Sequence, residues 1–440
     1  MRRLQAAFGG GADGSGARCA AAARSRGRSR GRRSGGAGAG GARGHACRPG
    51  GPRRGDGRAE ASGLRPPHAR GGARAGHGAA RRHGGPAVTA AADPSTLAHA
   101  APNRGAGLLG LLGLSVALLA VAGLALGPVT LSPAAVLAAL AGQGEPMAEA
   151  IVLHIRAPRV LLGLGVGAGL ALAGMALQGV LRNPLADPGL IGVSAGAALG
   201  AVGVIVLGGW FMGGVPAPLR PWIMPAAAFG GASLVTAFVF GLARRGGAVS
   251  VPTLILAGVA VNAIAGAGVG AMIYVSDDQQ LRDLTFWSMG SLGAAAWAPA
   301  TLAAVCIAAA GVGLARMARA LDLFQLGERA AFHAGLDVER AKRRVALGAA
   351  LAVGAGTAVA GPIGFVGLVA PHLARLVVGP AHRLALPAAA LLGAGLLLAA
   401  DLGVRLAVPP AEPPIGLATS LIGGPFFLWL LLARMERGDA

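Results

Sequence analysis

The chain has 440 residues, of which 54% are hydrophobic and only 13% are charged. This composition excludes an ordinary soluble globular protein and is typical of a polytopic membrane protein. The formal net charge of +21 belongs mainly to one part of the chain, because residues 1–105 hold 20 arginines and four acidic residues. The charge therefore indicates little about partners of the folded part.

Residues 1–105 are rich in Arg, Gly and Ala and poor in large aliphatic and aromatic side chains. Such a segment cannot bury enough apolar surface to offset the entropy of ordering, so we predict disorder there and a membrane domain over 106–440. One interpretation is a basic arm that binds nucleic acid or anionic lipid. We favour another, in which the segment is translated upstream sequence, Val88 marks an alternative GTG start, and nucleic acid is not a partner.

Ten apolar segments then follow, each near the length that crosses a bilayer except for one that is short and broken. They predict an all-α, polytopic integral membrane protein with about ten transmembrane helices. The segments are 106–127, 160–178, 190–207, 225–242, 254–274, 298–314, 345–360, a broken helix within 361–375, 384–402 and 415–432.

Local signals refine this outline. Ser132 before Pro133 predicts an N-cap that opens a short helix outside the membrane. The polar stretch 277–297 predicts a short non-spanning helix. Glycines four residues apart in the second span (163 with 167, 165 with 169) and in the fifth (266 with 270) predict close contacts between helices. Asn183 and Pro184 predict a chain reversal after the second span.

The stretch GPIGFVGLVAPHLAR, Gly361–Arg375, interrupts the apolar pattern. Its glycines (361, 364 and 367) and prolines argue against a simple spanning helix, and Pro371 disfavours helix at the residue before it. Such a break survives in lipid only where neighbouring protein satisfies the freed backbone groups. We expect His372 and Arg375 to cap the broken helix and to meet lipid headgroups, because one His without partners at ligand spacing is a poor metal site.

Three stretches resemble the membrane permeases of ABC importers for iron–siderophores, haem and vitamin B12, the FecCD-type family, whose members have the type II importer fold. They are Gly361–Arg375, the stretch His154–Ala197 that begins HIRAPRVLLGLGVGAG, and Asp401–Leu431, which begins DLGVRLAVPPAEPPIG. The similarity runs in order from about Leu108 to Arg434. It implies a permease subunit without catalytic residues or cofactors, which moves a ferric siderophore, haem or cobalamin by alternating access.

The chain has one lysine, Lys342, and no glycine-rich turn precedes it as a P-loop would require. Any ATP hydrolysis must therefore come from a partner chain. The resemblance implies a cytoplasmic coupling loop that docks on this ATPase. The residues assigned to it are Leu326, Gly327, Glu328, Ala331, Gly335 and Leu336. An ordinary solvated loop is the alternative.

The resemblance also implies that Arg156, Arg159 and Arg405 receive acidic residues of an extracytoplasmic substrate-binding protein. An interfacial anchor explains Arg159 equally well, and Arg405 could instead pair with Asp401 four residues earlier on one helix face.

The remaining expectations concern assembly and location. The resemblance implies that a second permease copy, identical or homologous, completes the pore, and that apolar and small residues of the second, fifth and eighth spans line it. The excess of arginine in alternate loops predicts that both termini are cytoplasmic, and the resemblance implies the inner membrane of a bacterium. The rival class is an ion-coupled secondary transporter, for which Asp401 is the one acidic residue within a predicted span.

Overall fold

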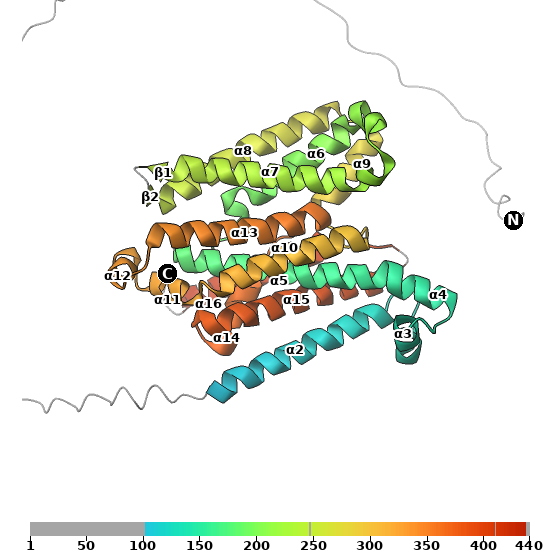
Figure 1. The fold of residues 1–440 in the computed structure, drawn as a ribbon, viewed down its shortest axis with the longest axis horizontal. Helices are drawn as coiled ribbons and strands as arrows, with labels where there is room; N and C mark the ends of the chain where they lie inside the picture. Colours follow the sequence, from blue (N-terminus) through green and yellow to red (C-terminus); the bar gives the residue numbers. More distant parts are fainter. Residues whose placement is uncertain (1–101, 246–247, 410, 437–440) are drawn as a thin grey trace, which may run out of the picture. The chain divides into compact units, whose positions relative to one another are not determined.

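The long helices run side by side with their axes nearly aligned, some parallel and some antiparallel (Figure 1). The computed structural model describes residues 102–245, 248–409 and 411–436. The predicted basic extension lies almost wholly outside the described residues. Within them, eight helices are long and apolar enough to cross a membrane. These are α2 (Pro102–Ala125), a continuous helix Pro146–Leu181 that contains α4 (Pro146–Glu149) and α5 (Ala157–Leu181), α6 (Val193–Phe211), α7 (Arg220–Ala243), α8 (Val251–Val275), α10 (Trp297–Ala315), α13 (Val338–Ala360) and α15 (His382–Ala407).

Two further apolar helices complete the set, the short α14 (Val366–Val378) and α16 (Ile415–Glu436). The ten helices coincide in order with the ten predicted spans, so the predicted all-α membrane fold is confirmed. The smaller elements are α3 (Pro133–Leu140), α9 (Asp278–Ser288), α11 (Ala318–Gln325), α12 (Glu328–His333), short 3₁₀ turns at Pro188–Ile191, Met212–Gly214 and Ala217–Leu219, and a two-residue antiparallel ladder of β1 (Arg244–Arg245) with β2 (Ala248–Val249).

The short helices gather at the two ends of the bundle. Helices α3, α4 and α9 lie at one end, whereas β1, β2, α11 and α12 lie at the other, which we call the α12 end (Figure 1). The predicted N-cap at Ser132 is confirmed, because its side chain accepts a hydrogen bond from the amide of Ala135. Asp277, which the sequence did not single out, forms a capping box with Gln280 at the start of α9. The predicted non-spanning helix over 277–297 is α9.

Helix α5 is the centre of the bundle and packs against α10, α13, α14 and α15. Nearly all of its side chains from Val166 to Val180 are buried within the chain. Gly167 faces Gly393 of α15 so closely that a Cβ on either glycine would clash with the other's carbonyl. The predicted close contact in the second span is thus confirmed.

Two helices extend further than the sequence predicted. The second span begins at Pro146 instead of residue 160, with a π-helical stretch Ala150–Arg156 that runs directly into α5. The ninth continues through Arg405 to Ala407. Arg156, Arg159 and Arg405 therefore belong to helices and are not in loops, since the apolar pattern ends before the hydrogen-bonded backbone does.

Candidate functional site

The chain is broken between α13 and α14, where the sequence predicted an interruption. Gly361 has a φ of 71° and ends α13, and Gly364 lies in the non-helical link before Phe365. A side chain on Gly361 would clash with the carbonyl of Trp287, so both the backbone conformation and the close approach require glycine. The amide of Ser291 donates to the carbonyl of Ala360 at 2.8 Å and satisfies the end of α13.

Pro371 lies inside α14, which corrects the prediction that it would exclude helix at Ala370. A proline removes the hydrogen bond to the carbonyl four residues earlier, here that of Gly367. Gln178 of α5 supplies a replacement donor, with its Nε2 at 3.4 Å from the Gly367 oxygen. This approach is possible because Gly174 presents no side chain where α5 crosses α14. Neighbouring protein therefore satisfies the freed backbone group.

Arg375 fixes the side chain of Gln178 and does not cap α14. Its Nη2 donates to Gln178 Oε1 at 2.7 Å, which fixes the amide that reaches Gly367. His372 is in mid-helix, with its ring edge-on to Phe426 at 5.9 Å between centroids. Helix α14 continues to Val378 and ends at Gly379, which has a φ of 86°. The expectation that His372 and Arg375 cap the helix is corrected accordingly.

The predicted reversal at Asn183 and Pro184 is present. Helix α5 ends in a left-handed residue, Arg182, and Asn183 Oδ1 then accepts the amide of Leu185 at 2.9 Å. In this Asx turn the side chain stands in for a backbone acceptor. The reversal leads directly to Asp187, whose carboxylate accepts the amide of Gly189 at 2.6 Å.

The three arginines predicted to dock a binding protein come together at the end opposite α12, and all three are buried. Arg159 forms an ion pair with Asp401 at 2.8 Å and with Glu412 at 2.6 Å. Nε of Arg405 lies 3.1 Å from the other oxygen of Asp401, in an ion pair too bent for a hydrogen bond. The alternative pairing of Arg405 with Asp401 is therefore present.

Arg156 and Arg405 also donate hydrogen bonds to backbone carbonyls at and just beyond the end of α2. Arg156 donates to the carbonyls of Leu124, Ala125 and Val129, and Arg405 to those of Gly123 and Leu126. The unpaired carbonyls at a helix C-terminus need such donors. In this conformation the three guanidinium groups hold α2, α5 and α15 together.

Asp401 lies between two arginines and is 3% exposed. A carboxylate neutralised by two fixed cations is poorly suited to load and release a coupling ion. The cluster thus argues against an ion-coupled secondary transporter.

The α12 end carries a short, partly detached element made of α11 and α12. Gly327, with a φ of 104°, separates the two helices, and Gly335, with a φ of 85°, ends α12. Leu326 is 71% exposed and Phe332 67%, whereas Ala331 is fully buried beneath them. The amide of Leu336 donates to the Ala331 carbonyl, and Asp337 then caps α13 by accepting the amide of Arg340.

Lys342 anchors this element and is only 4% exposed. Its Nζ lies 2.9 Å from Glu328 of α12, 3.2 Å from Glu339 of α13 and 3.0 Å from the carbonyl of Val249. Glu339 in turn accepts the amide of Val249 at 2.8 Å. One ammonium group thus joins α12, α13 and the β1–β2 turn between α7 and α8. The sequence offered one signal for this role, because Glu339 lies three residues before Lys342 on the same face of α13.

The fold and these two ends define a polytopic membrane permease without a nucleotide-binding motif of its own. A sequence profile of the FecCD transport family matches residues 114–433. The chain belongs to this family, which confirms the resemblance that its motifs carried.

Individual relatives agree with this assignment. The hemin transport system permease protein of Yersinia pestis is 48% identical over 65% of this chain and 84% of the relative. The cobalamin import system permease protein of Halobacterium salinarum is 42% identical over 66% of this chain and 75% of the relative. A solved structure of a metal-chelate type ABC transporter in an inward-facing conformation matches with a TM-score of 0.63 and 31% identity, covering 74% of this chain and 99% of that one.

Proposed function

We propose that the chain imports a metal chelate, a ferric siderophore, haem or cobalamin, in a complex with a separate ATPase and a binding protein. The observation that carries this proposal is the α11–α12 element, which displays two large apolar side chains, Leu326 and Phe332, on a base fixed by Lys342. Exposed apolar side chains on a polar, solvent-directed element are typical of a protein interface.

The ATPase would dock on α12. The flanking glycines allow the helix to project from the bundle, and the Lys342 network connects it to α13 and to the α7–α8 turn. A rigid-body movement of the ATPase could then displace these helices together.

The binding protein would dock at the opposite end, near Arg156, Arg159 and Arg405. Glu412 is 40% exposed and occupies the outer donor of Arg159, so a carboxylate of the binding protein could replace it. An arginine fork pairs with carboxylates in two places at once, which favours such an exchange. Because all three arginines also bond to their own chain, docking there would require part of the cluster to reopen.

A second permease copy would cover α8. No described atom lies within 4 Å of the position that a Cβ would take on Gly266 or Gly270, so the predicted contact of this pair is not made within the chain. Glycines on a helix surface allow close packing against a neighbouring helix, whereas contact with lipid does not require them. The subunit composition of the purified complex would show whether the second copy is identical or homologous.

The α12 end would face the cytoplasm of a bacterial cell. Arg244, Arg316, Arg343 and Arg344 are exposed at this end of the bundle, as the excess of positive charge on the inner side requires. With ten spans, both termini would lie on that side of the inner membrane.

The test is purification of the tagged full chain with its gene neighbours in mild detergent, followed by reconstitution in liposomes. ATPase activity stimulated by loaded binding protein, together with uptake of the chelate, would support the proposal. Uptake that persists without ATP, or a chain that purifies without an ATPase, would contradict it. Loading the binding protein with haemin, cobalamin or a ferric siderophore would then identify the cargo.

A further inference from the structure

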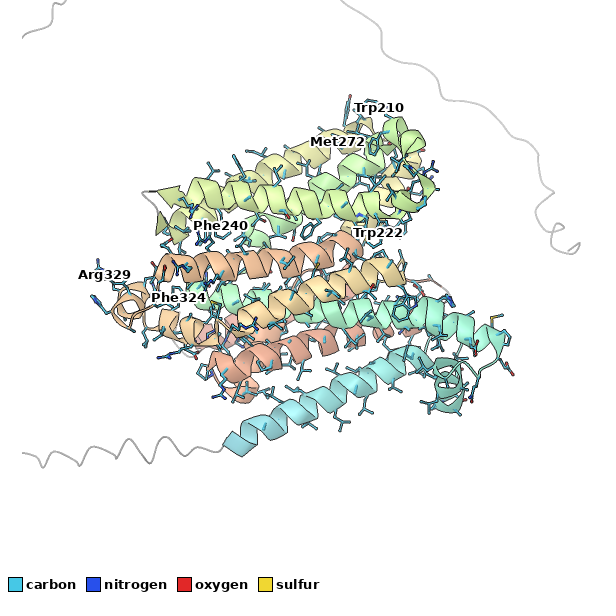
Figure 2. All side chains as sticks on the ribbon, viewed as in Figure 1. Trp210, Trp222, Phe240, Met272, Phe324 and Arg329 are labelled. Carbon is cyan, nitrogen blue, oxygen red and sulfur yellow. The ribbon has the colours of Figure 1, made fainter. Side chains whose placement is uncertain are left out.

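A cavity of about 530 Å³ lies between α7 and α13 at the α12 end. Its walls are mainly apolar and include Phe229, Phe240, Ala346 and Ala350. Figure 2 shows Phe240 on the side of α7 that faces α13, near β1 and β2. The volume is within the range of pockets that hold small ligands.

The cavity opens on a surface that lipid would cover. Leu347 at its edge is 64% exposed, and Leu234 and Phe238 project from α7 with most of their surface uncovered. Thr236 also lines the cavity and is 5% exposed, yet its hydroxyl makes no hydrogen bond to any described residue. A buried hydroxyl without a partner is costly, and a bound polar group could satisfy it.

The rim of the cavity is cationic. Arg244 at the start of β1 and Arg343 of α13 both line it and are exposed, and neither forms an ion pair with a described residue. The carboxylate of Glu339 is also at the rim, but Lys342 and the amide of Val249 already engage it. The two arginines are therefore the groups available to an incoming anion.

We propose that this cavity binds an anionic phospholipid, with an acyl chain between α7 and α13 and the phosphate between Arg244 and Arg343. Basic pockets between transmembrane helices are suited to anionic headgroups, and the arginine fork matches phosphate geometry. Free phosphate would use the rim alone and leave the apolar walls uncovered. A lipid uses both parts of the site.

The lipid would lie against Glu339, which contacts both Lys342 and the β1–β2 turn. Occupancy would thus hold α7 and α13 together next to the point where α12 is attached. None of the residues assigned to the two proposed docking surfaces lines this cavity.

The experiment is native mass spectrometry of the full chain released from mixed micelles that hold equal amounts of phosphatidylglycerol and phosphatidylcholine. We expect the wild-type chain to retain phosphatidylglycerol preferentially. The double variant Arg244→Gln/Arg343→Gln should retain it roughly thirtyfold less, as expected for the loss of two charges near an anionic lipid. Arg316→Gln/Arg319→Gln, which removes two arginines outside the cavity, is the matched control and should behave as wild type.

A second variant separates the two parts of the site. Ala350→Phe fills the cavity and leaves the arginines in place, so it should also lower retention of the lipid while its melting temperature stays near that of the wild type. Equal retention of the two lipids by the wild type, or an effect of the control as large as that of Arg244→Gln/Arg343→Gln, would overturn the proposal. So would competition by inorganic phosphate alone, or by haemin, because either would assign the site to a different ligand.

Discussion

Lys342 Nζ and Glu328 Oε2 lie 2.9 Å apart and join α12 to α13 across the loop that contains Gly335. The pair is asymmetric, since Lys342 is nearly fully buried and Glu328 is 38% exposed at its side chain. A buried ammonium needs its partners more than a half-exposed carboxylate does. Substitutions at the two positions should therefore have different consequences.

Glu328→Arg should uncouple ATP hydrolysis from uptake. The new guanidinium would repel the Lys342 ammonium and displace α12 from its contact with α13. The other helices of the bundle would keep their packing. We expect uptake to fall about tenfold or more with ATPase activity retained, measured on the reconstituted complex. Glu328→Gln keeps the size and one acceptor oxygen and should lose much less. Normal uptake by a stably expressed Glu328→Arg protein would remove the coupling role from α12.

Lys342→Met should loosen the β1–β2 turn as well as α12. It removes the donor to Val249 and leaves Glu339 with only the amide of that residue. Hydrogen exchange should rise in segment 244–250 and in α12, with little change in α15. Arg344→Met, which alters an exposed neighbour on α13, is the control. Unchanged exchange in segment 244–250 would show that the ammonium does not hold the turn.

Asp401→Asn should destabilise the chain by about 3–5 kcal/mol, the usual cost of breaking a buried ion pair. Two guanidinium groups, those of Arg159 and Arg405, would then lie close together with no charge between them. Thermal unfolding in detergent measures the loss. Glu412→Gln serves as the comparison, because Glu412 is half exposed and its loss should cost about 1 kcal/mol or less. Equal stability of Asp401→Asn and wild type would mean that the ion pairs of Asp401 do not stabilise the fold.

Hydropathy and the order of the motifs were sufficient to predict the membrane-spanning helices and their order along the chain. The ends of the helices were less predictable, because Arg156 and Arg405 continue a helix where backbone carbonyls at the end of α2 accept their hydrogen bonds. Those carbonyls are 31 and 32 positions from Arg156, and 279 and 282 positions from Arg405, so a local apolar pattern does not reveal them. Similarly, Pro371 looked like a helix terminator because the donor that replaces its amide comes from Gln178 on another helix.

Gly174→Ala should be severely destabilising although Ala is the better helix former. The added Cβ would clash with the Gly367 carbonyl at the crossing of α5 and α14, and both partners there are backbone. Overpacking of this kind costs about 1–3 kcal/mol or more. Gly113→Ala in α2 has no atom of the described residues within 4 Å of the new methyl and should be neutral or slightly stabilising. Equal melting temperatures of the Gly174→Ala and Gly113→Ala proteins would contradict the close backbone contact between α5 and α14.

Asp187→Asn should raise stability at neutral pH and change it little in acid. Burial raises the pKa of the Asp187 carboxyl above its ordinary value, and the hydrogen bond from Gly189 opposes this only in part. Because the folded state binds this proton more tightly than the unfolded state, unfolding becomes easier as pH rises from the unfolded pKa through the folded one. Asparagine keeps the oxygen that accepts the Gly189 amide and carries no charge. The difference in melting temperature between variant and wild type should therefore be largest near pH 7.5 and should shrink toward pH 4. A variant that is less stable than wild type at pH 7.5 would show that the carboxylate itself is required at this turn.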